Sequence, residues 1–273
     1  MPRALFPADR LFVIAGPCVV EGDALNLKVA EHLLRLSERV PGGIIFKASF
    51  DKANRSNAGA HRGPGIAGGL AALSRVRERT GLPILTDVHE AAQCGVVGEV
   101  VDVLQIPAFL CRQTDLLVAA GRTGRAVNVK KGQWLHPEGM RGAVDKVRGA
   151  RRRPAEVAVT ERGSFFGYGD LVVDMRSLSR MATATGSPVI FDGTHSVQQP
   201  GKGIGGASGG VREMIAPLTL AAAKAAIRES LNDPAQRDMA RLERMIAACF
   251  RSDDIREGRD AFMEKRVPVF KGR

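Results

Sequence analysis

Short apolar runs rich in β-branched residues alternate with longer amphipathic stretches over the first two hundred residues. Each run is long enough for one strand, and its continuous apolar character is typical of a strand covered on both faces. Amphipathic stretches between the runs include residues 25–39, 68–80 and 116–120. The predicted strands are residues 11–15, 43–48, 83–86, 101–106, 126–129, 156–160 and 188–191.

This alternation predicts an α/β protein with a parallel sheet. Seven strands favour a (β/α)8 barrel over an open doubly wound sheet, although periodicity alone does not show whether the sheet closes. Polar residues follow almost every strand, as in Gly16-Pro17-Cys18 and Asp192 through Ser196. Barrel enzymes carry their active sites at these carboxyl ends, so the pattern favours an enzyme.

The alternation of strand-like and helix-like segments stops after about residue 212. Residues 217–227 are rich in alanine and predict a helix, and 238–250 has helical spacing as well. No eighth strand is apparent, because the β-like residues 267–270 lie near the terminus and contain a proline.

Lys and Arg number 40 against 29 Asp and Glu among 273 residues, so the net charge is 40 − 29 = +11. Such a surplus favours anionic partners. Aromatic residues make up only 5%, fewer than stacking on single-stranded nucleic acid requires. The basic run 148–153 is interpreted as a solvated loop rather than a nucleic-acid patch.

The four cysteines, at 18, 94, 111 and 249, form no CxxC pair and follow no secretory signal. A reducing, cytoplasmic compartment is the simplest interpretation. No apolar run approaches the roughly 20 residues that span a bilayer, so no membrane association is predicted.

Cationic side chains recur on or just after the predicted strands. Converging cations suit phosphate and carboxylate groups, although any one of them alone could be an ordinary surface charge. The segment 51–56 adds an amide and a hydroxyl, which suits a phosphorylated polyhydroxy ligand or a capped loop. The six cations are Lys47, Lys52, Arg55, Arg112, Lys130 and Arg162.

Cys18 and His195 follow the first and seventh strands. A Cys/His pair suits zinc, iron, manganese or another divalent ion when carboxylates complete the shell. The alternative is a small buried cysteine and a structural histidine.

Long ordered blocks of the chain resemble the 3-deoxy-D-manno-octulosonate-8-phosphate synthase family. The resemblance covers about residues 11–215, and FDKANRS distinguishes this branch from the heptulosonate-phosphate synthases. The blocks are IAGPC at 14–18, FKASFDKANRS at 46–56, TDVHE at 86–90, QIPAFLCRQTDLL at 105–117, NVKKGQ at 128–133, TERG at 160–163, FGYGDLVVDMRSL at 166–178 and FDGTHSVQQPG at 191–201.

The resemblance implies a cytoplasmic homotetramer with a (β/α)8 barrel that makes a lipopolysaccharide sugar from phosphoenolpyruvate and arabinose 5-phosphate. It implies that phosphoenolpyruvate is held by Lys47, Lys130 and Arg162. It implies that arabinose 5-phosphate is held by Lys52, Asn54, Arg55 and Ser56, with Arg112 reaching a neighbouring subunit's sugar phosphate, and that Asp87 and Gln105 line the pocket.

The metal-dependent form of the family has a Cys after the first-strand GP, as Cys18 is here, and His195 matches its second ligand. The family's other two ligands, a Glu and an Asp, lie in an eighth-strand segment that this sequence lacks, so the metal site is expected to be incomplete. Tail carboxylates at 253, 254 and 257 are candidate substitutes.

The ending, residues 250–273, resembles instead the C-terminal helical segment of the enoyl-CoA hydratase/isomerase family. The expected organisation is a synthase barrel over 1–217 and a helical tail over 218–273. The leading hypothesis is an active synthase. The alternatives are a barrel that binds phosphorylated ligands without turnover and a basic nucleic-acid-binding protein.

Overall fold

The structure, a computed structural model, describes residues 4–54, 59, 61–152, 155–166, 169–203 and 208–231. The chain divides into two units, Met1–Ala223 and Lys224–Arg273. The first unit contains every strand that the structure describes. In the second, the described part is the backbone of the last residues of helix α7 (Ile215–Leu231).

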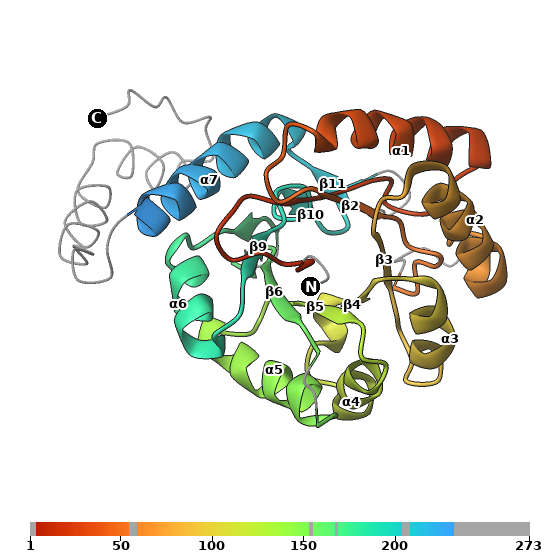
Figure 1. Cartoon of the computed structure of the whole chain (residues 1–273). Helices are drawn as coiled ribbons and strands as arrows, with labels where there is room; N and C mark the ends of the chain where they lie inside the picture. The colour runs from red at the N-terminus through yellow and green to blue at the C-terminus, as the bar shows by residue number, and fades with distance from the viewer. Residues whose placement is uncertain are drawn as a thin grey trace, which may run out of the picture. The chain divides into compact units, whose positions relative to one another are not determined.

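A seven-stranded parallel sheet forms the centre of the first unit, in the order β1-β2-β3-β4-β5-β6-β9 (Figure 1). Neighbouring strands of this sheet follow one another along the chain, and the sheet curls around a central axis. The strands are β1 (Val13–Ala15), β2 (Ile44–Lys47), β3 (Ile84–Asp87), β4 (Val103–Ile106), β5 (Ala126–Lys130), β6 (Val157–Glu161) and β9 (Val189–Phe191).

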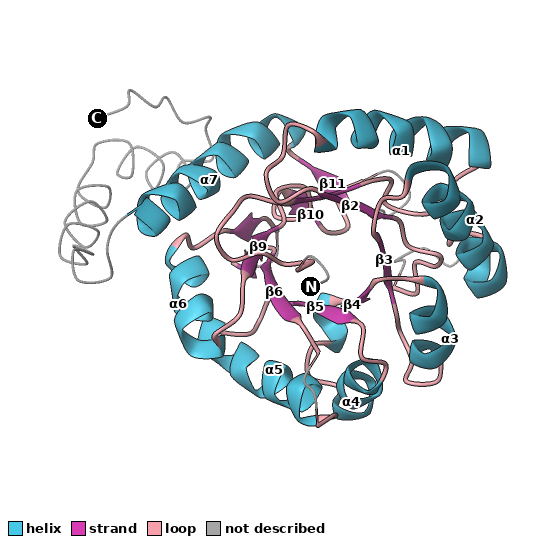
Figure 2. Cartoon of the chain, viewed as in Figure 1, coloured by secondary structure: helices cyan, strands magenta, loops and turns pink. Residues whose placement is uncertain are grey.

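Helices connect the strands and surround the sheet on the outside (Figure 2). They are α1 (Asp23–Ser37), α2 (Gly65–Thr80), α3 (Gln93–Val100), α4 (Thr114–Arg122), α5 (Met140–Gly149) and α6 (Arg176–Thr185), and α7 begins after the last strand. Short elements complete the chain: η1 (Ala108–Leu110), η2 (Pro137–Gly139), η4 (Arg212–Met214) and the antiparallel pairs β7 (Ser164–Phe165) with β8 (Leu171–Val172) and β10 (Gln198–Gln199) with β11 (Gly209–Gly210). No described helix is long and apolar enough to cross a bilayer.

The predicted barrel class is confirmed, with seven strands in the described part rather than eight. Within that part no strand joins β9 to β1, as the absence of an eighth-strand pattern predicts. The beginning of α7 lies between α6 and α1 in the ring of helices (Figure 1). There Thr219 lies so close to Gly193 that a Cβ at 193 would be 2.3 Å from the threonine hydroxyl.

Side chains alternate between two apolar layers. The larger layer, between sheet and helices, includes Val127, Val129, Val157 and Val159. The smaller one fills the barrel interior, where residues such as Leu85 and Ala158 meet Phe6. Phe6 and its neighbours fill one end of the barrel interior with apolar side chains. Polar side chains lie at the other end, at the carboxyl ends of the strands.

All seven predicted strands are confirmed, with ends shifted by no more than two residues. The first strand begins at Val13 rather than at Leu11, which is 64% exposed. The predicted helix at 217–227 is confirmed within α7. The basic run 148–153 is only partly a loop, because Arg148 belongs to the last turn of α5 and donates to the backbone oxygens of Thr185 and Gly186.

Candidate active site

A continuous chain of hydrogen bonds crosses the carboxyl ends of five neighbouring strands. Thr160 on β6 donates to Asn128 on β5 over 2.7 Å, and Asn128 donates to Gln105 on β4 over 2.9 Å. Gln105 and Ser49 both donate to the Asp87 carboxylate. All five side chains belong to buried residues, so the network fixes the floor of a polar site.

Asp87 lies between two lysines. The Lys52 and Lys47 ammonium groups are 3.7 and 3.9 Å from Asp87 Oδ2, and Lys52 also donates to Ser49 Oγ over 2.7 Å. Burial opposes ionisation of Asp87, but Lys47, Lys52 and Lys130 together outweigh it and hold its pKa well below the usual range. Asp87 is therefore negatively charged, and its carboxylate attracts the surrounding lysine ammonium groups.

Lys47 is buried, and its ammonium donates to the backbone oxygen of Cys18 over 3.1 Å. Burial lowers the pKa of Lys47 to about 8, against the opposing effect of Asp87. The two strand ends approach closely because residue 16 is glycine, where a Cβ would lie 2.1 Å from the Lys47 backbone oxygen. Lys47 is thus charged near neutral pH but able to give up its proton.

Lys130 at the end of β5 contacts Asp192, which follows β9. The Lys130 ammonium donates to Asp192 Oδ2 over 2.8 Å, and His195 Nδ1 lies 2.8 Å from the same oxygen. Burial favours the neutral acid, but Lys130 and His195 keep the pKa of Asp192 well below its usual value. Asp192 therefore orients a lysine on one side and a histidine on the other.

Arg162 is only 7% exposed and donates through Nη2 to Gln198 Oε1 over 2.9 Å. Its Nη1 is buried without a hydrogen-bond partner among the described residues. Burial lowers the pKa of Arg162 below its ordinary value. A buried guanidinium with an unused donor is well suited to an anionic ligand.

Cys18 and His195 meet across the two edges of the sheet. A hydrogen bond from His195 lowers the pKa of the exposed Cys18 thiol to about 6, with Lys52 and Lys47 acting in the same direction against burial. The two predicted metal donors are thus brought together. No group of three or more His, Cys, Asp or Glu side chains in the described part of the chain could hold a metal ion. These residues alone do not complete a metal site, and the candidate carboxylates at 253, 254 and 257 lie outside the described residues.

Of the four other residues predicted to bind the sugar phosphate, two are described, and both are exposed. Asn54 is exposed in the turn after β2, and Arg55 and Ser56 lie outside the described residues. Arg112 is exposed and lines a separate cavity of about 270 Å³ together with His136 and Lys146.

Asn128, Thr160 and Gln198 were not among the predicted site residues, although Asn128 and Thr160 complete the floor of the site. The strand pattern contains a feature that could have identified the first two. Asn128 and Thr160 interrupt apolar strands, and Asn128 shares the face of Lys130 because side chains two residues apart point the same way.

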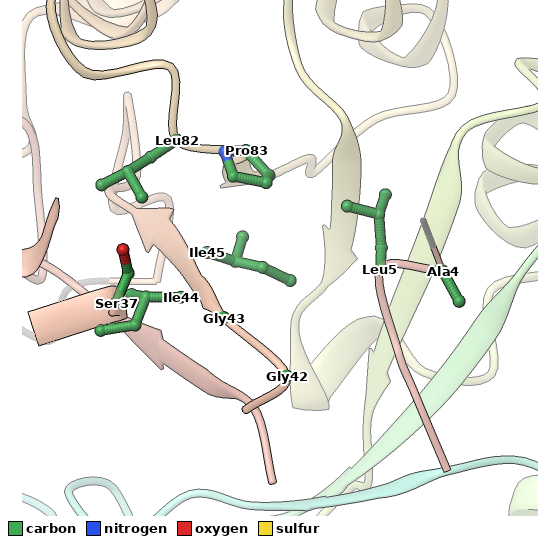
Figure 3. A pocket seen from close by; sticks show the side chains of 9 residues that line it. All are labelled: Ala4, Leu5, Ser37, Gly42, Gly43, Ile44, Ile45, Leu82 and Pro83. Atoms are coloured by element: carbon green, nitrogen blue, oxygen red, sulfur yellow. The ribbon is translucent and has the colours of Figure 1, made fainter. Parts of the chain in front are cut away.

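A cavity of about 240 Å³ lies at the opposite end of the barrel, between the N-terminal segment and the start of β2. Figure 3 shows Leu5 and Ile45 extending into this space, whereas Ile44 points toward Ser37. Its lining is almost entirely apolar or glycine and carries no cation, so it does not share the chemistry of the polar end.

The sequence pattern described as the DAHP synthetase I family matches residues 7–253. Relatives named 2-dehydro-3-deoxyphosphooctonate aldolase include one from Syntrophotalea carbinolica, 52% identical over 229 residues that cover 81% of each chain. Another, from Nitrobacter winogradskyi, is 56% identical over 218 residues, covering 80% of this chain and 75% of the relative. A third, from Rhodopseudomonas palustris strain HaA2, is 57% identical over 212 residues, covering 78% and 73%. With a (β/α) barrel, a cationic site at its polar end and these relatives, the chain belongs to the DAHP synthetase I family.

Proposed function

We propose that this chain condenses phosphoenolpyruvate with arabinose 5-phosphate and water, giving 3-deoxy-D-manno-octulosonate 8-phosphate and inorganic phosphate. The observation that carries the proposal is the cluster of Lys47, Lys52 and Lys130 around Asp87, with the free donor of Arg162. Two phosphorylated substrates bring several negative charges into one site, and convergent cations are what such substrates require. The names of the relatives support the same reaction.

Within this proposal Lys47, Lys130 and Arg162 hold the phosphate and carboxylate of phosphoenolpyruvate. Their side chains are largely buried, which strengthens their interaction with anions. Lys52, with the segment Asn54, Arg55 and Ser56, holds arabinose 5-phosphate, and Asp87 and Gln105 line the space between the two substrates.

The reaction joins carbon 3 of the enol to the sugar aldehyde carbon while water adds at carbon 2, and phosphate then leaves from carbon 2. The aldehyde oxygen gains a proton as the carbon–carbon bond forms. Lys47, whose pKa is about 8, is suited to donate that proton, because a proton donor works best when its pKa lies near the working pH. Within this proposal His195, whose Nδ1 lies 2.8 Å from Asp192, orients water or accepts its proton when no cation is bound to its other ring nitrogen.

A divalent cation held by Cys18 and His195 is part of the proposal. Bound there, it would supply Lewis-acid chemistry to the aldehyde and water. Two protein donors make a weak site unless further oxygen ligands complete it. Metal analysis of the purified protein, with Cys18→Ala as the comparison, tests this assignment, and activity unaffected by either chelator or Cys18→Ala would remove it.

A second copy of this chain is the proposed partner. Phe109 and Trp134 stack with ring centroids 5.7 Å apart, although both are about half exposed. Phe165, which is 45% exposed, lies close by, since its N–H donates to the backbone oxygen of Gln133 over 3.0 Å. Exposed aromatic patches of this kind mark association sites. Within this proposal Arg112, which is exposed, reaches the sugar phosphate of a neighbouring copy. Sedimentation of the wild type and of Trp134→Ser tests the assembly, with a smaller species expected for the variant.

A cytoplasmic location and a role in lipopolysaccharide sugar synthesis complete the proposal. The free thiols of Cys18, Cys94 and Cys111 fit a reducing compartment.

The decisive experiment measures phosphate release on mixing both substrates with the full chain, with and without added divalent metal. Sustained release that requires both substrates is the expected result. Calorimetric binding of phosphoenolpyruvate without turnover would instead favour a barrel that only binds phosphorylated ligands. That alternative is favoured by the unpaired edges of β1 and β9 in the described part of the sheet.

A further inference from the structure

Two charged residues occupy positions in the layer between sheet and helices where the strand pattern otherwise places valine. On β5, Val127 and Val129 face this layer, and Lys131 follows in the same alternation. On β6 the corresponding series is Val157, Val159 and Glu161. Lys131 is 0% and Glu161 1% exposed, so the pair is fully buried.

The contacts of this pair reach three connecting segments. Lys131 Nζ lies 3.5 Å from Glu161 Oε2 and donates to Ser164 Oγ over 3.1 Å and to the Leu135 backbone oxygen over 3.3 Å. Glu161 accepts from the Gly163 N–H over 2.6 Å and from the Ser177 hydroxyl on α6. The pair therefore joins the loop after β5, the loop after β6 and the start of α6.

Net stability is a poor explanation for such a pair. Removing two charges from water costs about as much as their attraction returns, and apolar residues of similar size often serve equally well. What an apolar pair cannot reproduce is the set of directional hydrogen bonds that orient the two loops. Gly163, for example, has a φ of +89°, a conformation that its bond to Glu161 helps to hold.

The neighbours of the pair in the sequence are two of the substrate cations. Lys130 precedes Lys131, Arg162 follows Glu161, and both point into the barrel because adjacent side chains alternate. We propose that Lys131 and Glu161 are positioning residues, which hold the backbone of both strand ends so that Lys130 and Arg162 fit phosphoenolpyruvate. This inference rests on the proposed function and extends it to residues that touch no substrate.

The test separates positioning from stability with the double variant Lys131→Met/Glu161→Leu. Its thermal midpoint should stay close to that of the wild type. Its calorimetric Kd for phosphoenolpyruvate should rise about tenfold or more, because misplacing a binding group by about 1 Å is costly. The KM for phosphoenolpyruvate should rise in step, whereas the Kd and KM for arabinose 5-phosphate should stay within about twofold.

A conservative variant, Lys131→Met/Glu161→Gln, keeps one acceptor oxygen for the Gly163 N–H, while its amide N–H can donate to the Ser177 hydroxyl oxygen, and it should recover most of the lost affinity. It also replaces the first variant if that one does not fold. The matched control is Arg77→Met, which breaks the ion pair with Asp102 beside the amino ends of β3 and β4. The control should lower the thermal midpoint and leave phosphoenolpyruvate affinity unchanged.

Unchanged phosphoenolpyruvate affinity in a folded double variant would overturn the inference while leaving the proposed function intact. Wild-type protein that binds phosphoenolpyruvate but releases no phosphate would remove the proposed turnover, and the binding comparison would still decide the positioning role. Wild-type protein that binds no phosphoenolpyruvate would remove both.

Discussion

The strands in the middle of the sheet differ from the two at its edges. Every residue of β2, β3, β4 and β6 is buried, whereas β1 and β9 are half-buried along their whole length. Lys47, Asp87 and Gln105 lie on the middle strands, while Cys18 and His195 follow the edge strands.

A strand with partners on both sides has its backbone fixed by two sets of hydrogen bonds, and an edge strand by only one. The cationic half of the site is therefore built on the firmer part of the sheet. The thiol and imidazole come together across β1 and β9, which no described strand joins. The substrate-binding half of the site therefore lies on strands that have two neighbours, and the candidate metal half follows strands that have one described neighbour.

The largest effect is expected for Lys130→Met in the middle of the site. The change removes a substrate cation and leaves the Asp192 carboxylate without its lysine, so kcat/KM should fall about a thousandfold. Phosphate release under saturating arabinose 5-phosphate measures it. Lys28→Met removes an exposed lysine on α1 and serves as the control, with activity close to wild type. Equal losses in both variants would contradict the assignment of Lys130.

Identical truncations in the two regions should differ in their effect on stability. Ile84→Ala on β3 empties a 0% exposed position and should lower the free energy of unfolding by about 3 kcal/mol. Ile14→Ala on the half-buried strand β1 should cost only about 1 kcal/mol, because less apolar surface is lost. Urea unfolding measures both. Similar costs would mean that the edge is as firmly packed as the middle.

The Asp87 carboxylate should make stability depend on acid pH. Its pKa is depressed in the folded protein relative to about 3.9 in the unfolded chain, so its contribution is full above about pH 5 and is lost as pH falls through 4 and below. Asp87→Asn should lower the free energy of unfolding by about 2 kcal/mol at pH 6.5, and the difference from wild type should shrink toward acid pH.

Denaturation at several pH values follows this difference. Asp23→Asn, in an exposed pair with Arg75, is the control and should behave like the wild type at every pH. A difference for Asp87→Asn that stays constant down to acid pH would show that hydrogen bonding, rather than charge, carries the effect.

The smallest effect on turnover is expected at the edge. A cation held by two protein donors is weakly bound, so chelator should slow phosphate release by only about tenfold. Cys18→Ala should cause a similar loss and abolish the response to chelator. Cys94→Ala, which removes a buried thiol on α3, is the matched control and should keep the chelator response. A loss as large as that of Lys130→Met would mean that Cys18 contributes as much to turnover as a substrate-binding lysine, contrary to this ranking.

Much of the fold and part of the site followed from the sequence. Apolar runs located all seven strands, because a strand buried on both faces has few polar positions. The residues on or just after those runs included Lys47, Asp87, Lys130 and Arg162, and parallel strands bring their carboxyl ends to one side. The pattern of hydrophobic and polar residues did not predict that Arg112 lines a separate cavity, because the position of a loop depends on the elements that it packs against.

The sequence by itself determined the order of strands and helices, the end of the barrel that carries the site, and the absence of an eighth-strand pattern. Only the tertiary structure decided which charges meet: Lys130 with Asp192 across 62 residues, Lys131 with Glu161 in the apolar layer, and Cys18 with His195 across two sheet edges. The reason is physical. Alternation of side chains is a local property of a strand, whereas the partner of a buried charge is set by strands brought together from distant parts of the chain.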